Sequence, residues 1–204
     1  MKLLREYVRE LLFEAAKQPR DLPEADVYVT IVADGPDDVE IFYSNEKGQR
    51  FFDHIDDMEG RIAISKPDLP CGGAFEVTSA KATRGWGPLL YDVAMEYATE
   101  YGGGLIADRY SVSPDARKVW SYYLRKRKDV KAIQMDSPSN SLTPETDDDN
   151  CGQETALYDF GESIPSKTPW TESPLSKRYV KTGPKSQYAT YKLASLNRLV
   201  TLED

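Results

Sequence analysis

Cysteine, histidine and long apolar runs are scarce in this 204-residue sequence. Two cysteines, Cys71 and Cys151, are too few for a disulfide scaffold, and with the single histidine, His54, they exclude a typical structural zinc site. No run approaches the roughly 18 consecutive apolar residues of a membrane-spanning helix, and residues 1–16 carry too many charges for a signal peptide. These absences predict a soluble, cytoplasmic protein that does not enter a membrane and holds no metal.

Charge is distributed unevenly along the chain. Residues 136–175 hold nine acidic residues and one lysine, which accounts for the whole formal net charge of -8. Residues 105–135 hold eight basic and three acidic residues. The acidic balance therefore describes one segment and does not argue against an anionic partner elsewhere.

Hydrophobic periodicity predicts a first half that is mostly antiparallel β-structure. Apolar residues at helical spacing predict an amphipathic helix over 3–16. Alternating apolar residues and intervening turn residues then predict strands over 27–31 and 39–43, joined as a hairpin through 34–38, and further strands over 61–65 and 74–79.

The period changes after this region. Helical spacing runs from Pro88 to the residue before Gly102, and a short apolar strand follows at 105–107. Ser113, as the N-cap, and Pro114, at the first helical position, predict a helix that ends near Arg127. A strand is expected over 130–135.

The remainder reads as extensions to this core. Residues 136–175 contain five prolines and many polar residues, which predicts a partly ordered acidic surface excursion that adds little to the core, with a short strand at 156–160. The alternating stretch 188–193 is expected to return to the sheet as a strand. The domain organisation that we predict is an N-terminal helix and linker (1–25), a core (26–135), the acidic excursion (136–175) and a basic C-terminal segment (176–204).

The turn that precedes the second predicted helix is the most informative motif. Gly85-Trp86-Gly87-Pro88 joins a strand to a helix N-terminus, where unpaired N–H groups and the helix dipole favour an anion such as a pyrophosphate. A tight turn with a purely structural role is an equally supported interpretation of this motif. The sequence has no Gly-x-Gly-x-x-Gly and no Gly-Lys-Ser/Thr, which excludes the Rossmann fingerprint and the P-loop.

This stretch resembles the GNAT superfamily of N-acetyltransferases, over about residues 26–135. The family motif is Gln/Arg-x-x-Gly-x-Gly/Ala between a strand and a helix, followed by a leucine, and Gly85, Gly87 and Leu89-Leu90 match it. Its next strand, small polar residue and alanine correspond to 105–108, Ser113 and Ala116. The resemblance implies an α/β fold (α+β in strand order), with a mixed, centrally splayed sheet flanked by helices.

The resemblance also implies acetyl-CoA as the acyl donor and an amine as the acceptor. It assigns cofactor binding to the strand end and the turn, at Ser79, Ala80, Arg84, Gly85, Trp86, Gly87, Pro88 and Leu89. Glu76 and Asp108 are the candidate bases and Tyr123 the candidate acid. Each has a plainer alternative: Glu76 as a solvated strand residue, Asp108 as a partner of Arg109, and Tyr123 as a packing aromatic.

Two departures from the family pattern support a second hypothesis. Ala82 stands at the opening Gln/Arg position, with Lys81 and Arg84 as nearby substitutes, and Trp120 stands where the family has its tyrosine. The alternative is a catalytically inactive GNAT-like binding or structural protein. Residues 1–7 resemble the starts of small bacteriophage proteins, so this alternative includes a virion or host-takeover component.

Weaker signals complete the candidates. The basic helix over 117–131, interleaved with aromatics, suggests a path for nucleic acid or CoA phosphates, although a solvated face is the plainer interpretation. His54 among aspartates and the run Asp147–Asp149 suggest a general base and a cation site, and both are typical of solvated loops. Cys151 lies among acidic residues, which predicts an unreactive thiol.

Overall fold

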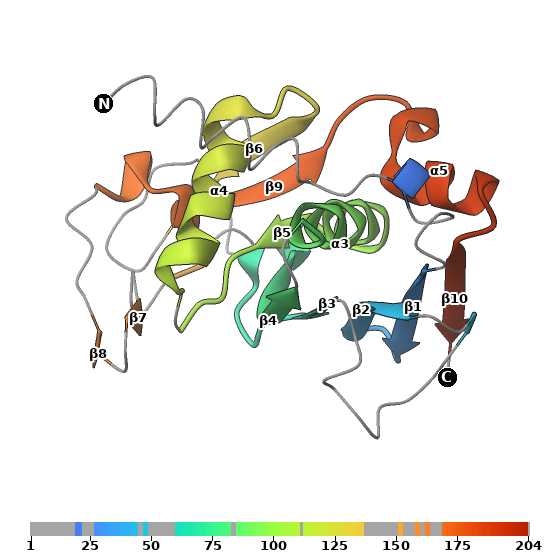
Figure 1. Cartoon of the computed structure of the whole chain (residues 1–204). Coiled ribbons are helices and arrows are strands. Elements are labelled where there is room, and N and C mark those ends of the chain that lie inside the picture. Colours follow the sequence, from blue (N-terminus) through green and yellow to red (C-terminus); the bar gives the residue numbers. More distant parts are fainter. Residues whose placement is uncertain are drawn as a thin grey trace. The chain divides into compact units, whose positions relative to one another are not determined.

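The computed structural model describes residues 19–21, 27–44, 47–48, 60–82, 85–110, 112–136, 151–152, 158–159, 162–163 and 169–203 (Figure 1). The strands are β1 (Tyr28–Asp34), β2 (Asp38–Ser44), β3 (Gly60–Ser65), β4 (Phe75–Ala82), β5 (Leu105–Ile106), β6 (Val130–Gln134), β7 (Tyr158–Asp159), β8 (Glu162–Ser163), β9 (Lys177–Lys181) and β10 (Leu199–Glu203). The α-helices in these residues are α3 (Gly87–Tyr101), α4 (Pro114–Lys126) and α5 (Ala189–Ser195). Short 3₁₀ helices are η1 (Pro19–Asp21), η3 (Cys71–Gly73), η5 (Trp170–Glu172), η6 (Pro174–Ser176) and η7 (Lys185–Gln187).

Eight of the strands form one mixed sheet, in the order β10-β1-β2-β3-β4-β5-β9-β6, and β7 pairs separately with β8. Neighbours β1 and β10 are parallel, as are β4 and β5, whereas β1–β2, β5–β9 and β6–β9 are antiparallel. A mixed sheet combined with helices confirms the predicted α/β class.

The chain divides into two compact units. The first comprises Met1–Ala63, Ser79–Ala94 and Pro184–Asp204, and the second comprises Ile64–Thr78 and Met95–Gly183. Strands β3 and β4 and helix α3 contribute residues to both units.

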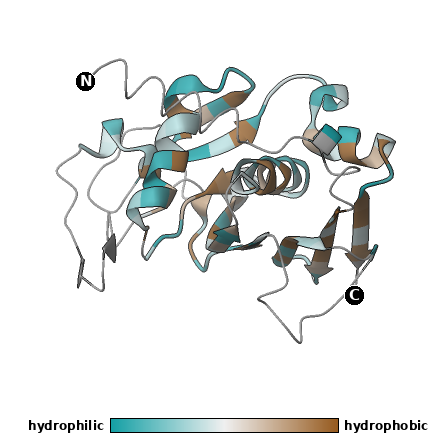
Figure 2. Cartoon of the chain, in the orientation of Figure 1, coloured by the Kyte–Doolittle hydropathy of each residue, from teal (hydrophilic) through white to brown (hydrophobic). Residues whose placement is uncertain are grey.

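The first unit is built on the β1–β2 hairpin. Ile31 of β1 lies opposite Ile41 of β2 and, on its other side, opposite Thr201 of β10. Ile31 and Ile41 are at most 4 % exposed, as expected for alternating residues that face a core. Helix α5 packs on β10 and η1 (Figure 1). Hydrophobic residues run along β1 and β10, whereas α4, in the second unit, is mainly hydrophilic (Figure 2).

The second unit places β9 between β5 and β6. Tyr179 of β9 lies opposite Leu105 on one side and opposite Ala132 on the other. Helix α4 contacts β6 and η6 and buries Trp120 and Tyr123. Its N-cap is Ser113, whose hydroxyl accepts a hydrogen bond from the Ala116 N–H at 3.2 Å, so the predicted start of this helix is confirmed.

Two glycine turns interlock in the second unit. A Cβ atom on Gly103 would lie 1.9 Å from the carbonyl oxygen of Gly72, and one on Gly102 would lie 2.8 Å from that of Gly73. The Gly103 N–H donates to the Gly73 carbonyl at 2.9 Å. The run 102–104 is therefore a close backbone contact with η3, and glycine is required there for steric reasons.

Most predicted elements within the described residues match the structure, and one predicted strand is wrong. The predicted strand over 188–193 is helix α5, because Ala189 and Leu193, four residues apart, share one buried helical face. The strands of this region are β9, which precedes the helix in the sequence, and β10, which follows it. The predicted helix over 3–16 lies outside the described residues.

Segment 136–175 contributes more to the core than its composition predicts. Cys151 is fully buried in a hydrophobic cluster with Cys71, Ala74, Ile106 and Met135. The Trp170 indole N–H donates to the Met135 carbonyl at 2.9 Å, and Leu175 is 1 % exposed. The expectation of an excursion that adds little to the core is wrong, because a few apolar residues within the polar segment supply the contacts.

Candidate functional site

The turn between β4 and α3 is anchored by an aromatic pair. Trp86 is 5 % exposed, and its ring centroid lies 4.4 Å from that of Tyr43. The Tyr43 hydroxyl also donates to the Trp86 carbonyl at 3.3 Å. Burial, assisted by the charge of Asp92, raises the pKa of Tyr43 well above its ordinary value, so the hydroxyl stays a donor. Trp86 is thus a structural anchor of this turn.

Gly85 and Gly87, the two glycines of the turn, suit their positions for different reasons. Gly85 has φ +93°, a conformation that favours glycine, whereas no such φ applies to Gly87. A Cβ atom on Gly87 would meet only the Cβ of Ala82, at an ordinary 3.7 Å. The fold therefore requires glycine at 85 but leaves open space at 87.

The start of α3, at Gly87, is the predicted anion-binding position. The first turn of α3 contains no acidic residue. Ser79, Ala80 and Pro88 are exposed and Leu89 is buried. Arg84, the predicted cationic member of the turn, lies outside the described residues.

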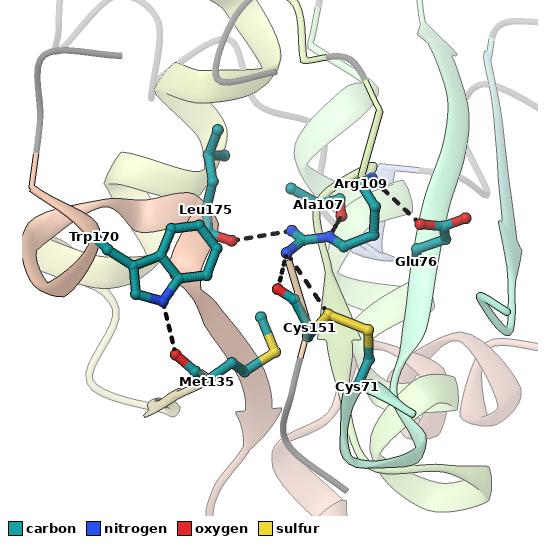
Figure 3. Close-up of a disulfide and its surroundings, with 8 residues drawn as sticks. All are labelled: Cys71, Glu76, Ala107, Arg109, Met135, Cys151, Trp170 and Leu175. Carbon is teal, nitrogen blue, oxygen red and sulfur yellow. Dashed lines mark hydrogen bonds between the residues drawn. A yellow bond between two sulfur atoms is a disulfide. The ribbon is translucent and has the colours of Figure 1, made fainter. Parts of the chain in front are cut away.

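Glu76 of β4 is a buried carboxylate. It is 7 % exposed, and its Oε2 accepts a hydrogen bond from the Arg109 main-chain N–H at 3.3 Å (Figure 3). Burial raises its pKa, the hydrogen bond from Arg109 opposes this, and the nearby charge of Asp108 adds to it. The alternative of a solvated strand residue is wrong, because β5 lies alongside Glu76, in register with Ile106.

Asp108 follows β5 and forms a local turn. Its Oδ1 accepts a hydrogen bond from the Tyr110 N–H at 2.7 Å, a typical Asx turn. Its charge acts on both Glu76 and Arg109. The structure therefore brings together two of the predicted site residues, Glu76 and Asp108, with Arg109 as their shared neighbour.

Tyr123 belongs to an aromatic cluster in the second unit. Its ring centroid lies 6.3 Å from those of both Trp120 and Tyr179, and the residue is 3 % exposed. The Arg127 guanidinium lies over the Tyr123 ring, 5.4 Å from its centroid. Packing accounts for this placement, and the role of Tyr123 as an acid stays a prediction.

A disulfide joins Cys71 to Cys151, which sequence reasoning missed. Both cysteines are fully buried, so the expected free thiol at Cys151 is wrong. Beside them lies Arg109, 2 % exposed, whose pKa burial lowers to about 10. Two cysteines 80 residues apart give no local signal of pairing, because only the fold brings them together.

The basic helix region has an excess of exposed cations. Asp129 is bound by Arg127 at 2.6 Å and by Lys181 at 2.9 Å, and Asp115 is bound by Lys118 at 2.6 Å. Besides Lys118, the exposed cations of this region are Arg125, Lys126, Lys128 and Lys131. The carboxylates of Asp115 and Asp129 thus have cationic partners already.

The predicted site residues are distributed over both compact units. The turn at 85–89 belongs to the first unit, and Glu76, Asp108 and Tyr123 belong to the second. His54 and Asp147–Asp149 lie outside the described residues. Within the part of the chain that is described, no group of three or more His, Cys, Asp or Glu side chains could hold a metal ion, and no helix has the length and apolarity of a membrane span.

Comparisons with protein-family models, with curated proteins and with solved structures found no match to this chain.

Proposed function

We propose that this protein is an acyl-CoA-dependent N-acyltransferase that transfers an acetyl group to an amine. The observation that carries the proposal concerns strand β4: a carboxylate that it buries and the glycine turn that follows it. Near its start β4 holds the buried carboxylate of Glu76, and beyond its end the chain enters the Gly85–Gly87 turn and helix α3. An acyltransferase of the GNAT type requires a base and a phosphate-binding turn, and the chain offers a candidate for each.

The strand pairing supports the same proposal. Strands β4 and β5 are parallel, but they pair only at Phe75–Leu105 and Glu76–Ile106. Strand β4 then continues to Ala82, and residues 78–82 are exposed. A strand that extends past its neighbour is the arrangement by which the splayed sheet of the GNAT superfamily receives acyl-CoA.

The residues of the turn fit a phosphate group. Gly87 has no contact that a side chain would violate, so glycine there suits the close approach of a ligand to the backbone. The first turn of α3 carries no acid that would repel phosphate. Bound CoA would supply the acyl group as an activated thioester, while Ser79, Ala80 and the turn at 85–89 would position it.

Glu76 is the base in this proposal. Because burial raises its pKa, its carboxylate is a stronger proton acceptor than an ordinary glutamate. It would take the proton that the acceptor amine must lose before it becomes nucleophilic. Asp108 would assist by raising the pKa of Glu76, and Tyr123 keeps its predicted role as proton donor.

Binding is tested by thermal shift with acetyl-CoA. Saturation at 100 times the dissociation constant adds about 2.7 kcal/mol, which should raise the melting temperature by roughly 5–10 °C for a chain of this size. Gly87→Glu should abolish the shift, since its carboxylate would occupy the phosphate position, and Gly87→Ala is the matched control that keeps the uncharged turn. A flat titration of the unmodified protein up to millimolar acetyl-CoA would overturn the proposal.

Catalysis is tested separately from binding. Glu76→Gln should lower acetyl transfer to an amine by about 10²–10⁴-fold, the usual contribution of a general base. The acetyl-CoA thermal shift should persist in this variant. Equal transfer rates in both proteins would remove Glu76 from the mechanism.

A second candidate function rests on Trp120. This residue takes the position of the family's tyrosine, is 1 % exposed and offers no hydroxyl. A GNAT-like scaffold without a proton donor would bind a ligand or partner without turnover. An acetyl-CoA thermal shift with no transfer to any of a panel of amines would favour this alternative.

A further inference from the structure

The disulfide lies against a buried positive charge. The Cys151 Sγ is 3.7 Å from Arg109 Nη1, which also lies 3.5 Å from the Cys151 carbonyl oxygen (Figure 3). Cys71 and Cys151 are fully buried, and Arg109 is 2 % exposed. A guanidinium at this distance from a sulfur atom is a strong influence on its chemistry, because burial reduces screening by water.

Main-chain groups hold Arg109 independently of the sulfur. Its Nε donates to the Ala107 carbonyl at 2.8 Å, and its Nη2 donates to the Leu175 carbonyl at 3.0 Å. These two hydrogen bonds come from segments before and after Cys151 in the sequence, and neither involves a sulfur atom.

The charge of Arg109 lacks a hydrogen-bonded anion among the described residues. The acceptors of its guanidinium are the three carbonyls and the sulfur, whereas Glu76 accepts from its main-chain N–H. A buried cation is more stable when an anion lies beside it. A thiolate at Cys151 would place an anion in direct contact with the guanidinium, in addition to the charges of Glu76 and Asp108 that already act on it.

Other charged groups near the pair act less directly. The Cys151 N–H donates to the main-chain carbonyl of Asp136. Asp136 is 6 % exposed, and the negative charge of its carboxylate opposes a thiolate at Cys151. The charges of Glu76 and Asp108 both act on Arg109. Arg178 lies beside Gly72, the neighbour of Cys71, and donates to the Gly103 carbonyl at 2.7 Å.

We propose that Cys71 and Cys151 are a redox-active pair, in which reduction releases Cys151 as a thiolate that Arg109 stabilises. The co-reactant is a dithiol. Because both cysteines are fully buried, the exchange requires local opening of the chain around them. One thiolate of the dithiol then attacks Cys71 Sγ, the S–S bond breaks, and the electron pair leaves on Cys151 Sγ beside Arg109. The second thiol of the reductant then attacks the mixed disulfide, forming the reductant's own disulfide, and Cys71 leaves and takes up a proton. The protein gains two electrons and the dithiol loses two.

Stabilisation of one thiolate favours the reduced form. The pair is then a reversible switch that ties residue 151 to η3 under oxidising conditions and releases it in a thiol-rich compartment. The proposal does not depend on the acyltransferase function, since it concerns only the sulfur atoms and Arg109.

The redox equilibrium tests the role of Arg109. The full chain is equilibrated with reduced and oxidised dithiothreitol at pH 7.5, and the disulfide fraction is measured by thiol alkylation and mass spectrometry. Arg109→Gln should shift the equilibrium constant about tenfold toward the disulfide, because at pH 7.5 a tenfold effect corresponds to Arg109 lowering the Cys151 thiol pKa by about two units from its ordinary value of about 8.5. Arg178→Gln, which removes a cation beside Gly72, is the matched control and should change it less than about twofold. Equal shifts in the two variants would overturn the proposal.

The thiol pKa values give a test that keeps Arg109 intact. Thiolate absorbance at 240 nm is titrated in Cys71→Ser, which reports Cys151, and in Cys151→Ser, which reports Cys71. We expect Cys151 to titrate below the ordinary thiol value of about 8.5 and Cys71 at or above it. A Cys151 pKa at or above that of Cys71 would contradict the proposal even if Arg109→Gln failed to fold.

Discussion

Glu96 and Lys181 form a buried ion pair in the second unit, in which Lys181 Nζ lies 3.4 Å from Glu96 Oε1 and the two side chains are 2 % and 5 % exposed. The same ammonium group contacts Asp129, and the Lys181 N–H donates to the Thr99 hydroxyl. Lys181 therefore links β9 to α3 and to the turn before β6.

Removing one partner of this pair should destabilise the protein strongly. Lys181→Met leaves Glu96 buried without its cation, which costs about 3–5 kcal/mol. The double variant Glu96→Gln/Lys181→Met should recover part of that loss, since no buried charge is left uncompensated. Urea unfolding at pH 7 measures the free energies, and a double variant no more stable than Lys181→Met would contradict the electrostatic explanation.

The contribution of Asp129 to the free energy of unfolding should depend on pH. Hydrogen bonds from Arg127 and then from Lys181 hold the pKa of Asp129 well below its usual range. A lowered carboxyl pKa stabilises the folded state at neutral pH, and this contribution is lost as pH falls below the unfolded value of about 3.9. The difference in unfolding free energy between the unmodified protein and Asp129→Asn should thus be largest near pH 7 and should narrow below about pH 4. A difference that is constant from pH 7 to pH 3 would show that the charge plays no part.

The two glycine positions at 103 and 87 should respond differently to alanine. Gly103→Ala forces a Cβ atom to 1.9 Å from the Gly72 carbonyl oxygen, and relief requires backbone movement, so a loss of about 1–3 kcal/mol or more is expected. Gly87→Ala meets no clash and adds helix propensity, so its effect should lie between zero and about 1 kcal/mol of stabilisation. Thermal melts of both variants compare them directly. A loss at Gly87 equal to that at Gly103 would show a packing role that the open space does not predict.

The exposed cations at the end of α4 and just after it, Arg125, Lys126 and Lys128, should bind polyanions. Lys126→Glu/Lys128→Glu should weaken binding of a single-stranded oligonucleotide and reduce its dependence on salt by roughly one unit of slope per lost phosphate contact. Lys192→Glu, which changes an exposed lysine of α5, is the control. Equal affinity of all three proteins, measured by fluorescence anisotropy, would identify the region as a solvated face.

Local rules predicted those elements whose signals are local. Ser113 and Pro114 define the start of α4 because capping involves only the first turn of a helix. The β1–β2 hairpin follows from alternating apolar residues around a turn. The apolar residues over 188–193 fit both the two-residue period of a strand and the 3.6-residue period of a helix. The segment is helical because Ala189 and Leu193 are buried on one helical face.

The site residues show where sequence reasoning is insufficient. Glu76 was placed on the correct strand, but its burial depends on β5 and on the N–H of Arg109, 33 residues away. The Arg109 contacts with Cys151 and Leu175 join residues 42 and 66 apart. The disulfide joins residues 80 apart. Such contacts arise only once the sheet has formed, and no short pattern encodes them.

The parallel pairing of β1 with β10 has a consequence for synthesis of the chain on the ribosome. Val29 lies opposite Leu199, so the β1 edge is translated long before the strand that covers it. At about 5–20 residues per second, the interval is roughly 10–30 s. During that time the β1–β2 hairpin exposes an unpaired edge, which is a template for pairing with other nascent chains. Chaperone contact or slow translation should therefore matter most for this edge.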